Sequence, residues 1–193
     1  MSQVIEDKIL ILKKTLHNEG SLIVSGLNRQ GAKMVFYARS ALQSRKRFGG
    51  GVLEPTHYVL VSYQESKQEG SLYRLTEAQL LEDFSQLRTD YDRLSLALWA
   101  VGVVEKMSRE GVVDSNELFD LLGNLLRSAE TSPHLSQLRA HFIVKLLSIQ
   151  GVFPTEEQWE KWRLLSVKEH NLLEEISPHE SKRLEGLLLS YIN

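Results

Sequence analysis

The spacing of apolar residues changes once along the chain. Before residue 76 they occur in short runs in which inward and outward positions alternate, a pattern that is typical of β-strands. Asn28–Gly31 is predicted to form a hairpin turn, because glycine readily adopts positive φ. The five predicted strands are Lys8–Thr15, Ser21–Leu27, Ala32–Ser40, Thr56–Tyr63 and Ser71–Leu75.

From Thr76 onward the apolar residues recur every three or four positions, as they do on one face of an α-helix. Helix-start signals follow one another to the end of the chain and predict a bundle of six or seven short helices. These signals are Thr76 with Gln79, Asp90, Asp114 with Glu117, Ser132-Pro133, Thr155 with Gln158, Ser166 with Glu169, and Ser177-Pro178 with Glu180. The helix that starts at Asp90 is predicted to bury Tyr91, Leu94, Leu98, Val101 and Met107.

These patterns predict an α+β protein. Five short strands with a longer interruption after the third are typical of an OB-fold β-barrel, which we assign to residues 1–75, and an all-α helical domain is assigned to residues 76–193. Charge is divided in a similar way. Residues 1–70 carry ten Lys or Arg against six Asp or Glu, whereas the remainder carries thirteen against nineteen. Opposite net charges suggest that the two domains have different partners.

The stretch from Gly20 to Leu53 contains six basic residues, three aromatic residues and no acidic residue, which is typical of a polyanion-binding surface. In the third predicted strand, alternation puts Lys33, Tyr37 and Arg39 on the face opposite the barrel interior. The Tyr37 ring could stack on a base between cations that contact phosphates, or it could simply cover the barrel surface. The predicted DNA-binding residues are Arg29, Lys33, Tyr37, Arg39, Arg45, Lys46, Arg47 and Phe48.

Arg45–Arg47 are predicted to lie in a flexible loop or a single helical turn, directly before Gly49–Gly51. The glycines do not match the phosphate-binding loop of nucleotide-binding proteins, because the Gly-Lys-Ser/Thr ending is missing and a strand follows where a helix is needed. We interpret them as a hinge that lets the basic loop adjust to a ligand.

Sequence motifs of enzymes are missing from the chain. It has no cysteine, which excludes disulfides, thiolate zinc sites and cysteine nucleophiles, and its six histidines have no metal-ligand spacing. It contains no HExxH motif, nucleophile elbow or dinucleotide fingerprint. No apolar run near the start is long enough for a signal peptide or a membrane span. We therefore expect a cytoplasmic protein without enzymatic activity, cofactor or membrane contact.

Several short motifs occur in an order that resembles one protein family. Leu12–Val24 is similar to its opening pair of strands, Gly31–Lys33 with Phe36–Ala41 to its basic strand and loop, and Gly51–Pro55 to the entry of its fourth strand. Asn116–Leu122 and Phe142–Gly151 resemble two of its helices. The family is RecO, the bacterial recombination-mediator and DNA-repair proteins, and the resemblance covers the whole chain.

The resemblance implies a non-enzymatic recombination mediator that is associated with the nucleoid. Members bind single- and double-stranded DNA and anneal complementary strands. They also dock on the acidic, aromatic-ended C-terminal tail of the single-strand-binding protein (SSB) and, together with RecR, help to load RecA. These activities and partners are what the resemblance implies for this chain.

Three features depart from the family pattern. Many members carry a four-cysteine zinc module after the position of Gly151–Pro154, so we expect a zinc-less member. Ser40 and Leu42 stand where the family usually has Gly and Arg, which shifts the cations to Arg45–Arg47. The chain is also short for the family, so no function of a C-terminal tail is assigned to it.

A receptor for the SSB tail needs an apolar slot for the aromatic ring and cations for the carboxylates. A spacing of three residues would put Arg139, Phe142 and Lys145 on one side of a helix. Phe142 would equally serve as a core residue, with the cations extending along its flank. The predicted peptide-binding residues are Arg127, Arg139, His141, Phe142 and Lys145.

Two other functions stay open at this point. One is a protein–protein adaptor with an OB-like barrel and an incidental basic loop, which would not be retained on heparin or single-stranded DNA. The other is a hydrolase that carries none of the known motifs and would need a deep polar pocket.

Overall fold

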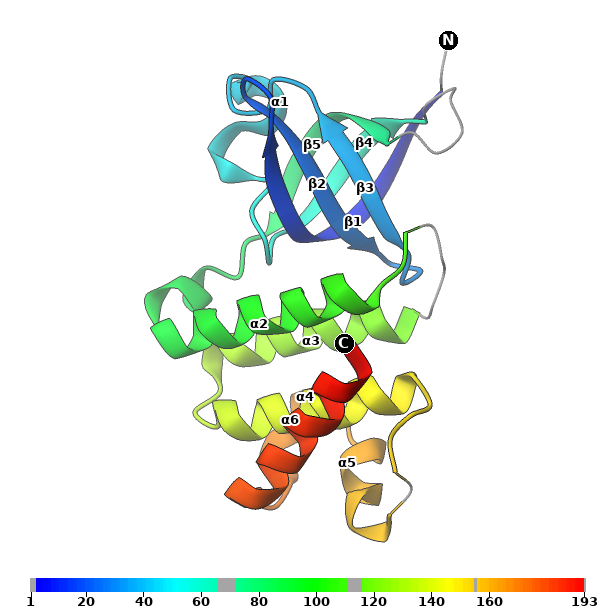
Figure 1. Cartoon of the computed structure of the whole chain (residues 1–193). Helices are drawn as coiled ribbons and strands as arrows, with labels where there is room; N and C mark the ends of the chain where they lie inside the picture. The colour runs from blue at the N-terminus through cyan, green and yellow to red at the C-terminus, as the bar shows by residue number, and fades with distance from the viewer. Residues whose placement is uncertain (1–2, 66–71, 111–115, 155, 193) are drawn as a thin grey trace.

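The computed structural model describes residues 3–65, 72–110, 116–154 and 156–192. Strands form the N-terminal part of the molecule and helices form the rest, as predicted (Figure 1). The strands are β1 (Val4–His17), β2 (Ser21–Asn28), β3 (Lys33–Ala38), β4 (Tyr58–Gln64) and β5 (Tyr73–Glu82).

The five strands close into a barrel in the order β1-β2-β3-β5-β4. Neighbouring strands are antiparallel except for β3 and β5, which run parallel. This is the arrangement of an OB-fold, so the predicted fold class is confirmed. Phe36 is fully buried inside the barrel, where its ring centroid lies 5.4 Å from that of Tyr63 and 5.9 Å from that of Tyr73.

The predicted hairpin turn at Asn28–Gly31 joins β2 to β3. The side-chain oxygen of Asn28 accepts hydrogen bonds from the backbone N–H groups of Gln30 and Ala32, at 3.1 and 2.9 Å. Gly31 has a φ of 79°, which other residues rarely adopt. The local chemistry of asparagine and glycine therefore fixes this turn, as predicted.

Strand β5 is longer than predicted and replaces a predicted helix. Thr76 and Gln79, which the sequence indicates as a helix start, lie inside β5, where Gln79 pairs with Leu60 of β4 and Thr76 lies at a bulge. The Thr76 hydroxyl donates to the Ser62 carbonyl oxygen at 2.8 Å instead of capping a helix. Pairing with β4 and β3 closes the barrel, and this long-range pairing overrides the local signal. The domain boundary predicted after residue 75 therefore falls within a strand.

The interruption between β3 and β4 contains one helical turn, α1 (Arg45–Phe48), followed by a 3-10 turn, η1 (Gly49–Gly51). Phe48 is only 6% exposed and belongs to the apolar core of the barrel together with Val52 and Leu53. The segment therefore covers one end of the barrel, at the top in Figure 1.

The helical region begins at the opposite end of the barrel. Helices α2 and α3 lie next to the barrel, and α4, α5 and α6 lie beyond them (Figure 1). The helices are α2 (Tyr91–Met107), α3 (Asn116–Thr131), α4 (Leu135–Ile149), α5 (Glu160–Leu164) and α6 (Pro178–Ile192), with 3-10 segments η2 (Ser85–Thr89), η3 (Glu157–Trp159) and η4 (Val167–Leu172).

Three of the predicted helix starts carry the expected caps. The Asp90 carboxylate accepts a hydrogen bond from the Arg93 N–H at 3.0 Å, at the start of α2. Ser166 with Glu169 forms a capping box at η4, and the Ser177 hydroxyl and the Glu180 side chain cap α6 in the same reciprocal way.

Helix α2 buries Val101, as predicted, but exposes two of the other residues that were predicted to be buried. Tyr91 is 84% exposed and Leu98 is 45% exposed, whereas Ala97 and Val104 are fully buried. The helix lies between the barrel and the other helices, so it is apolar on more than one side. A single stripe of large apolar residues therefore does not identify its buried surface.

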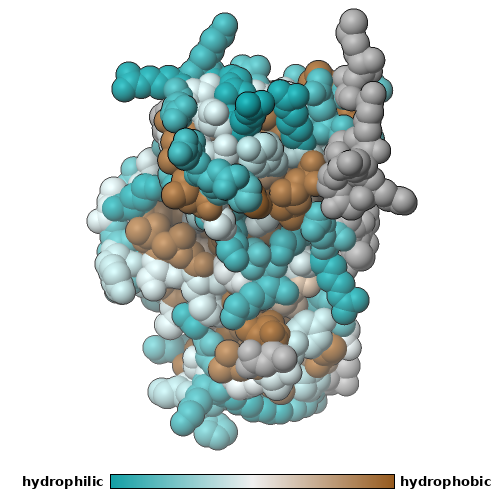
Figure 2. Space-filling view, turned by 45° about the horizontal axis from the view of Figure 1, so that its top comes forward, coloured by the Kyte–Doolittle hydropathy of each residue, from teal (hydrophilic) through white to brown (hydrophobic). Residues whose placement is uncertain are grey.

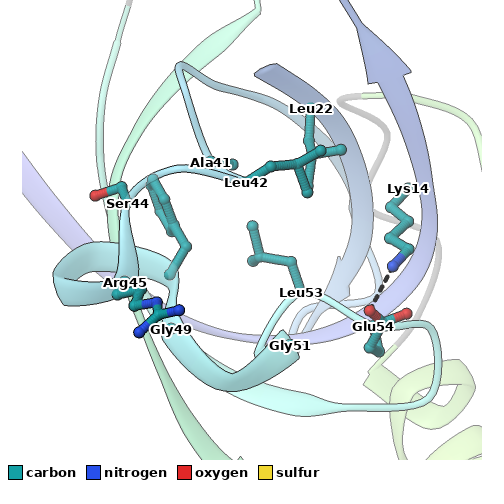
Figure 3. A pocket seen from close by; sticks show the side chains of 11 residues that line it. Lys14, Leu22, Ala41, Leu42, Ser44, Arg45, Gly49, Gly51, Leu53 and Glu54 are labelled. Carbon is teal, nitrogen blue, oxygen red and sulfur yellow. Dashed lines mark hydrogen bonds and ion pairs between the residues drawn. The ribbon is translucent and has the colours of Figure 1, made fainter. Parts of the chain in front are cut away.

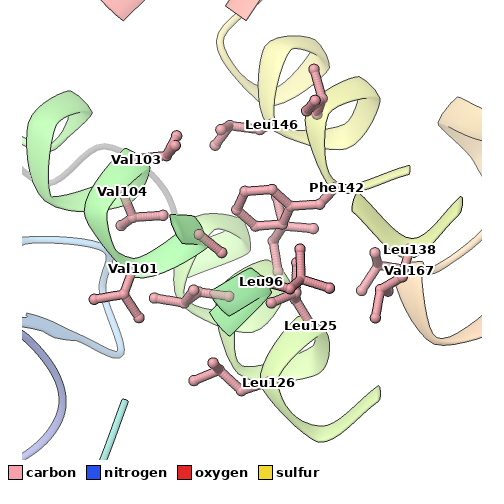
Figure 4. Close-up of a cluster of buried hydrophobic side chains, with 14 of the residues drawn as sticks. Leu96, Val101, Val103, Val104, Leu125, Leu126, Leu138, Phe142, Leu146 and Val167 are labelled. Carbon is pink, nitrogen blue, oxygen red and sulfur yellow. The ribbon is translucent and has the colours of Figure 1, made fainter. Parts of the chain in front are cut away.

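One apolar cluster extends from the helices into the barrel. Figure 4 shows its centre, where Phe142 lies among Leu96, Leu125 and Leu146. Three residues of the barrel strands belong to the same cluster, namely Leu10, Leu12 and Leu27. The helices therefore cover the outer face of the barrel at this end, whereas the outer face near the end that α1 closes is not covered by them.

The predicted helix starts at Asp114 and Thr155 and the predicted start of the fifth strand at Ser71 lie outside the described residues. Among the described helices, none combines the length and the apolar character that a membrane crossing requires.

Candidate nucleic-acid interface

An outer face of the barrel is open at the end away from the helices. Thr15, Ile23 and Tyr37 are paired in register on β1, β2 and β3, so their side chains point to the same face. Arg74 of β5 pairs with Tyr37 on the other side. Tyr37 therefore lies within a partly exposed row that crosses four strands.

The Tyr37 ring is half-buried and held in one orientation. The His17 ring contacts it edge-on, with 5.8 Å between the centroids, and the Tyr37 hydroxyl donates to the Ser21 hydroxyl at 3.3 Å. Met34 and Phe36 are buried on the opposite face of β3, so the predicted alternation in this strand is confirmed. The ring is positioned as a rigid surface against which a planar group can stack.

Four of the predicted cations gather next to this face and are called the basic end here: Arg39, Arg45, Lys46 and Arg47. Arg39 follows β3 directly, and the other three belong to α1. The Arg47 guanidinium donates to the Arg39 carbonyl oxygen at 3.0 Å and to the Ser44 hydroxyl at 2.8 Å. These two bonds fasten α1 to the end of β3.

Most cations of the basic end have no partner in the part of the chain that the structure describes. Within the described part of the chain, the side chains of Arg39, Arg45 and Lys46 form no hydrogen bond or ion pair. The whole segment of residues 13–53 contains a single acidic residue, Glu19. An excess of unpaired positive charge of this kind attracts the phosphates of a polyanion.

The surface at this end of the molecule combines polar and apolar areas. Figure 2 brings it forward and shows long hydrophilic side chains that project outward, with hydrophobic patches between them. Leu16 and Leu42 are among the exposed apolar residues of the barrel, at 65% and 64%.

Two of the predicted DNA-binding residues lie at the other end of the barrel. The Lys33 ammonium donates to the carboxylate and to the carbonyl oxygen of Glu105 in α2, both at 2.9 Å. Arg29 lies in the β2–β3 turn beside α3. The prediction that both residues share a surface with the basic end is wrong. A strand of six residues extends over roughly 20 Å, so β3 carries its two ends to different parts of the molecule.

The prediction that Phe48 binds DNA is also wrong. Its ring is buried in the barrel core, and the Arg47 guanidinium lies over it, 5.0 Å from the centroid. The ring is unavailable for stacking because it closes the end of the barrel.

A cavity of about 250 Å³ opens beside α1 (Figure 3). Lys14 and Glu54 form an ion pair at one side of it, and Arg45 lies at the other. Its apolar walls are formed by Leu22, Ala41, Leu42, Phe48 and Leu53.

The residues predicted to bind an acidic peptide do not form one surface. Phe142 is fully buried and packs edge-on against Trp99, with 5.8 Å between the ring centroids. His141 is also fully buried, and its Nε2 donates to the Trp162 carbonyl oxygen at 2.8 Å. Desolvation lowers the pKa of His141 to about 4, because the charged imidazolium is unfavourable in this apolar surrounding. Neither side chain can contact a peptide.

The two cations on either side of Phe142 have separate partners. The Arg139 guanidinium pairs with Glu185 and lies over the Trp99 ring at 3.9 Å, whereas the Lys145 ammonium donates to the Arg163 carbonyl oxygen at 2.6 Å. Each residue of an α-helix rotates by about 100°, so positions 139 and 145 lie about 120° apart. The prediction that they share one side of α4 is therefore wrong.

Arg127 keeps an exposed position on α3. Its guanidinium makes two hydrogen bonds to the Glu82 carboxylate, at 3.3 and 2.7 Å. It lies at a cavity of about 130 Å³ between the barrel and α3, which Phe84, Phe119 and Arg29 also line.

Three residues of the open face escaped prediction. A β-bulge between Ile11 and Lys13 shifts the alternation of β1. Because of this shift, Lys13 and His17 both point outward. Arg74 joins the face through the parallel pairing of β5 with β3. Alternation would have indicated that Arg74 points outward, but neither the bulge nor the strand pairing has a local sequence signal.

Comparison with known proteins gives a consistent result. Residues 1–84 match the family model for the N-terminal part of recombination protein O. The DNA repair protein RecO of Syntrophobacter fumaroxidans is 32% identical over 148 residues, which are 77% of this chain and 57% of that protein. RecO of Syntrophus aciditrophicus is 31% identical over 144 residues, 75% of this chain and 54% of that protein. RecO of Desulfatibacillum aliphaticivorans is 29% identical over 151 residues, 77% of this chain and 57% of that protein.

The fold defines the class of protein, an OB-fold barrel that packs against a helical bundle. The chain belongs to the RecO family. It spans between 54% and 57% of the length of these three relatives.

Proposed function

We propose that the chain is a non-enzymatic, DNA-binding recombination mediator in DNA repair. In this role it binds single- and double-stranded DNA, anneals complementary strands and helps to load RecA onto DNA that is coated with SSB. The relatives that are named DNA repair protein RecO support the general role. The observation that carries the DNA-binding part is a set of cations without a partner among the described residues, Arg39, Arg45 and Lys46, beside Tyr37 on the open face of an OB-fold.

The chemistry of this surface suits a nucleic-acid backbone. Cations that contact phosphates release condensed counterions, and this release supplies affinity for any sequence. A tyrosine ring stacks on any base, because every base has a π-face. OB-folds use the face of β2 and β3 for oligonucleotides, and Tyr37 lies on that face.

The same surface suits strand annealing. Phosphate contacts hold and orient a strand but leave the edges of its bases free, so a held strand can still pair with its complement. Long, flexible Lys and Arg side chains also accept both an extended strand and the duplex that forms from it. The proposed binding mode therefore permits annealing without a catalytic site.

The salt dependence of DNA binding tests the proposal. With about four to six phosphate contacts, the logarithm of the affinity for single strands should fall with log salt at a slope of about −3 to −4. Arg45→Gln with Lys46→Gln should flatten the slope by about 1.4, since each contact contributes roughly 0.7. Arg47 is left in place because its hydrogen bonds hold α1.

The matched control is Lys168→Gln with Lys182→Gln, which removes the same charge from two exposed positions of the helical region. We expect this control to bind DNA like the unchanged protein. If both double variants lose affinity equally, net charge rather than the basic end determines binding. If the unchanged protein is retained neither on heparin nor on single-stranded DNA at low salt, the barrel is instead part of a protein–protein adaptor.

We also propose the protein partners that family membership implies: the acidic tail of SSB, RecR and, indirectly, RecA. For the tail we propose the cavity between the barrel and α3, where Arg127 and Arg29 stand beside Phe84 and Phe119. An exposed ion pair contributes little, about 0–1 kcal/mol, so Arg127 can exchange Glu82 for a peptide carboxylate at small cost.

A fluorescent peptide that ends in acidic residues and phenylalanine tests this site. Arg127→Glu should weaken its binding by at least about tenfold, because the substitution replaces an attractive charge with a repulsive one. Arg183→Glu is the matched control, since Arg183 is also an exposed arginine that pairs with a glutamate, on α6. Equal effects of the two substitutions would rule out the cavity as the site.

A further inference from the structure

We propose that the cavity beside α1 is a pocket for one unpaired nucleobase of single-stranded DNA. The pocket would make the barrel end bind unpaired strands more tightly than duplexes. The inference rests on the proposed DNA binding and adds a ligand class and a preference to it.

The walls of the cavity match a base. Leu22, Leu42 and Leu53 supply apolar surface that can lie against the flat faces of the base. The lining also contains one residue with a hydroxyl group, Ser44. In Figure 3 the side chains of Leu22 and Leu53 point toward the centre of the cavity. At about 250 Å³ the space has the size of a small-molecule subsite.

The charges around the cavity fit a nucleotide. Glu54 is the one acidic residue of the lining, and its charge is offset by the ion pair with Lys14. Arg45 at the rim has no partner among the described residues, and neither does Lys46 next to it. A phosphate can therefore contact these cations while the attached base enters between the apolar walls.

The cavity adjoins the basic end, because Arg45 of α1 is part of its lining and Lys46 is the next residue. Arg47 of the same helix donates to the carbonyl oxygen of Arg39, which follows the strand that carries Tyr37. A strand held along Tyr37 and Arg39 therefore leads to the cations at the rim of the cavity. The anionic backbone that these cations attract favours a nucleobase over the apolar side chain of a protein partner as the occupant.

A paired base cannot enter such a pocket. Entry requires the base to leave its stack and its complement, which costs energy in a duplex and little in a single strand. The cations outside the cavity contact phosphates in both forms of DNA. The pocket therefore adds affinity for single strands alone.

Gly49→Leu tests the proposal because it fills the cavity. Gly49 lines the cavity, and its backbone is extended, with φ −65° and ψ 156°, which any residue can adopt. A Cβ added at this position would have the Arg45 side chain as its nearest neighbour, at 4.0 Å. We expect the affinity for a short oligothymidine to fall by about tenfold, the loss of roughly one stacked base, while the affinity for a duplex of equal length stays unchanged. Gly186→Leu is the matched control, since Gly186 on α6 also has open space around it.

A 2-aminopurine base within the oligothymidine gives a second measurement. Its emission should change when the unchanged protein and Gly186→Leu bind, and should change less with Gly49→Leu. Leu42→Gln, at an exposed position of the rim, makes the wall polar without filling it and should lower single-strand affinity in the same direction. It also keeps the test decisive if Gly49→Leu fails to fold.

The outcomes separate this inference from the proposed function. If the unchanged protein does not bind DNA, both the proposed function and the pocket are refuted. Normal binding with the same ratio of single-strand to duplex affinity in all variants would overturn the pocket and leave the basic end in place. An equal loss for both forms of DNA would mean that the substitution disturbs the cations, and the pocket would again be refuted.

Discussion

Arginine residues have different surroundings in the barrel and in the helical region. On the helices, Arg127, Arg139 and Arg183 each pair with a glutamate. At the barrel end, Arg39 and Arg45 have no partner among the described residues. A paired cation must give up its carboxylate before it can contact a phosphate, whereas an unpaired one gives up only water and counterions. Local charge balance therefore identifies the candidate surface better than the number of cations does.

Strand β3 shows the same difference within six residues. At one end the Lys33 ammonium is paired with Glu105 and is partly covered by α2. Just beyond the other end, the Arg39 side chain is exposed and unpaired within the described part of the chain. Alternation assigns the two cations to the same face of the strand, but their tertiary surroundings differ. Residue type alone therefore does not separate a structural cation from a ligand-binding one.

The largest expected effect tests whether barrel and helices are independent. Phe142→Ala in the helical core and Phe36→Ala in the barrel should each lower the free energy of unfolding by about 3–5 kcal/mol. Because Leu10, Leu12 and Leu27 join the helical cluster, we expect both variants to shift one shared transition in urea. Two separate transitions, each moved by one variant, would contradict this coupling.

The next effect is the pH dependence of stability, which comes from buried histidines, among them His57 beside β4 and His141 in α4. The pKa of His141 is about 4 in the folded protein and about 6.5 when the chain is unfolded. The unfolded state therefore binds a proton first, and stability is lost as the pH falls from 6.5 to 4, by up to about 3 kcal/mol. Burial lowers the pKa of His170 as well, which adds in the same direction.

His141→Leu isolates this contribution. The free energy of unfolding of the variant should approach that of the unchanged protein as the pH falls, because the variant has no proton to take up at this position. The measurement is urea unfolding at several pH values between 7 and 4.5. Parallel curves would mean that His141 is not the source of the dependence.

Sequence reasoning predicted the elements that local chemistry determines. Asn28 and Gly31 set a turn that needs only their own side chain and backbone freedom, and Asp90 caps α2 through a bond to Arg93. Alternation in β3 separated Phe36 in the core from the exposed face, since one face of a strand is buried and the other is not.

The failures involve contacts that the local sequence does not encode. Thr76 resembles a helix cap but lies in a strand that closes the barrel. Phe48 and Lys33 have the residue types of a DNA-binding surface, yet one completes a core and the other pairs with a helix that is distant in sequence. The cavity beside α1 escaped prediction for the same reason, because its walls come from β2 and from the segment after β3.

A smaller effect sharpens the contrast along β3. Lys33→Ala leaves the Glu105 carboxylate partly covered and without its partner, and should cost about 2 kcal/mol of stability. A double-mutant cycle with Glu105→Gln measures the coupling directly. The salt slope of DNA binding should not change, because Lys33 is already paired. A reduced slope would mean that Lys33 contacts DNA after all.

The smallest expected change in stability comes from Arg45→Ala, at the other end of this comparison. Arg45 is exposed and makes no hydrogen bond or ion pair within the described residues, so the free energy of unfolding should change by less than about 0.5 kcal/mol. The slope of log affinity against log salt should nevertheless fall by about 0.7, one phosphate contact. Arg183→Ala, which removes a paired arginine from α6, should leave the slope unchanged. The two regions differ as proposed only if stability and DNA affinity respond to different arginines. A slope that falls equally in both variants would mean that pairing with a glutamate does not keep an arginine from DNA.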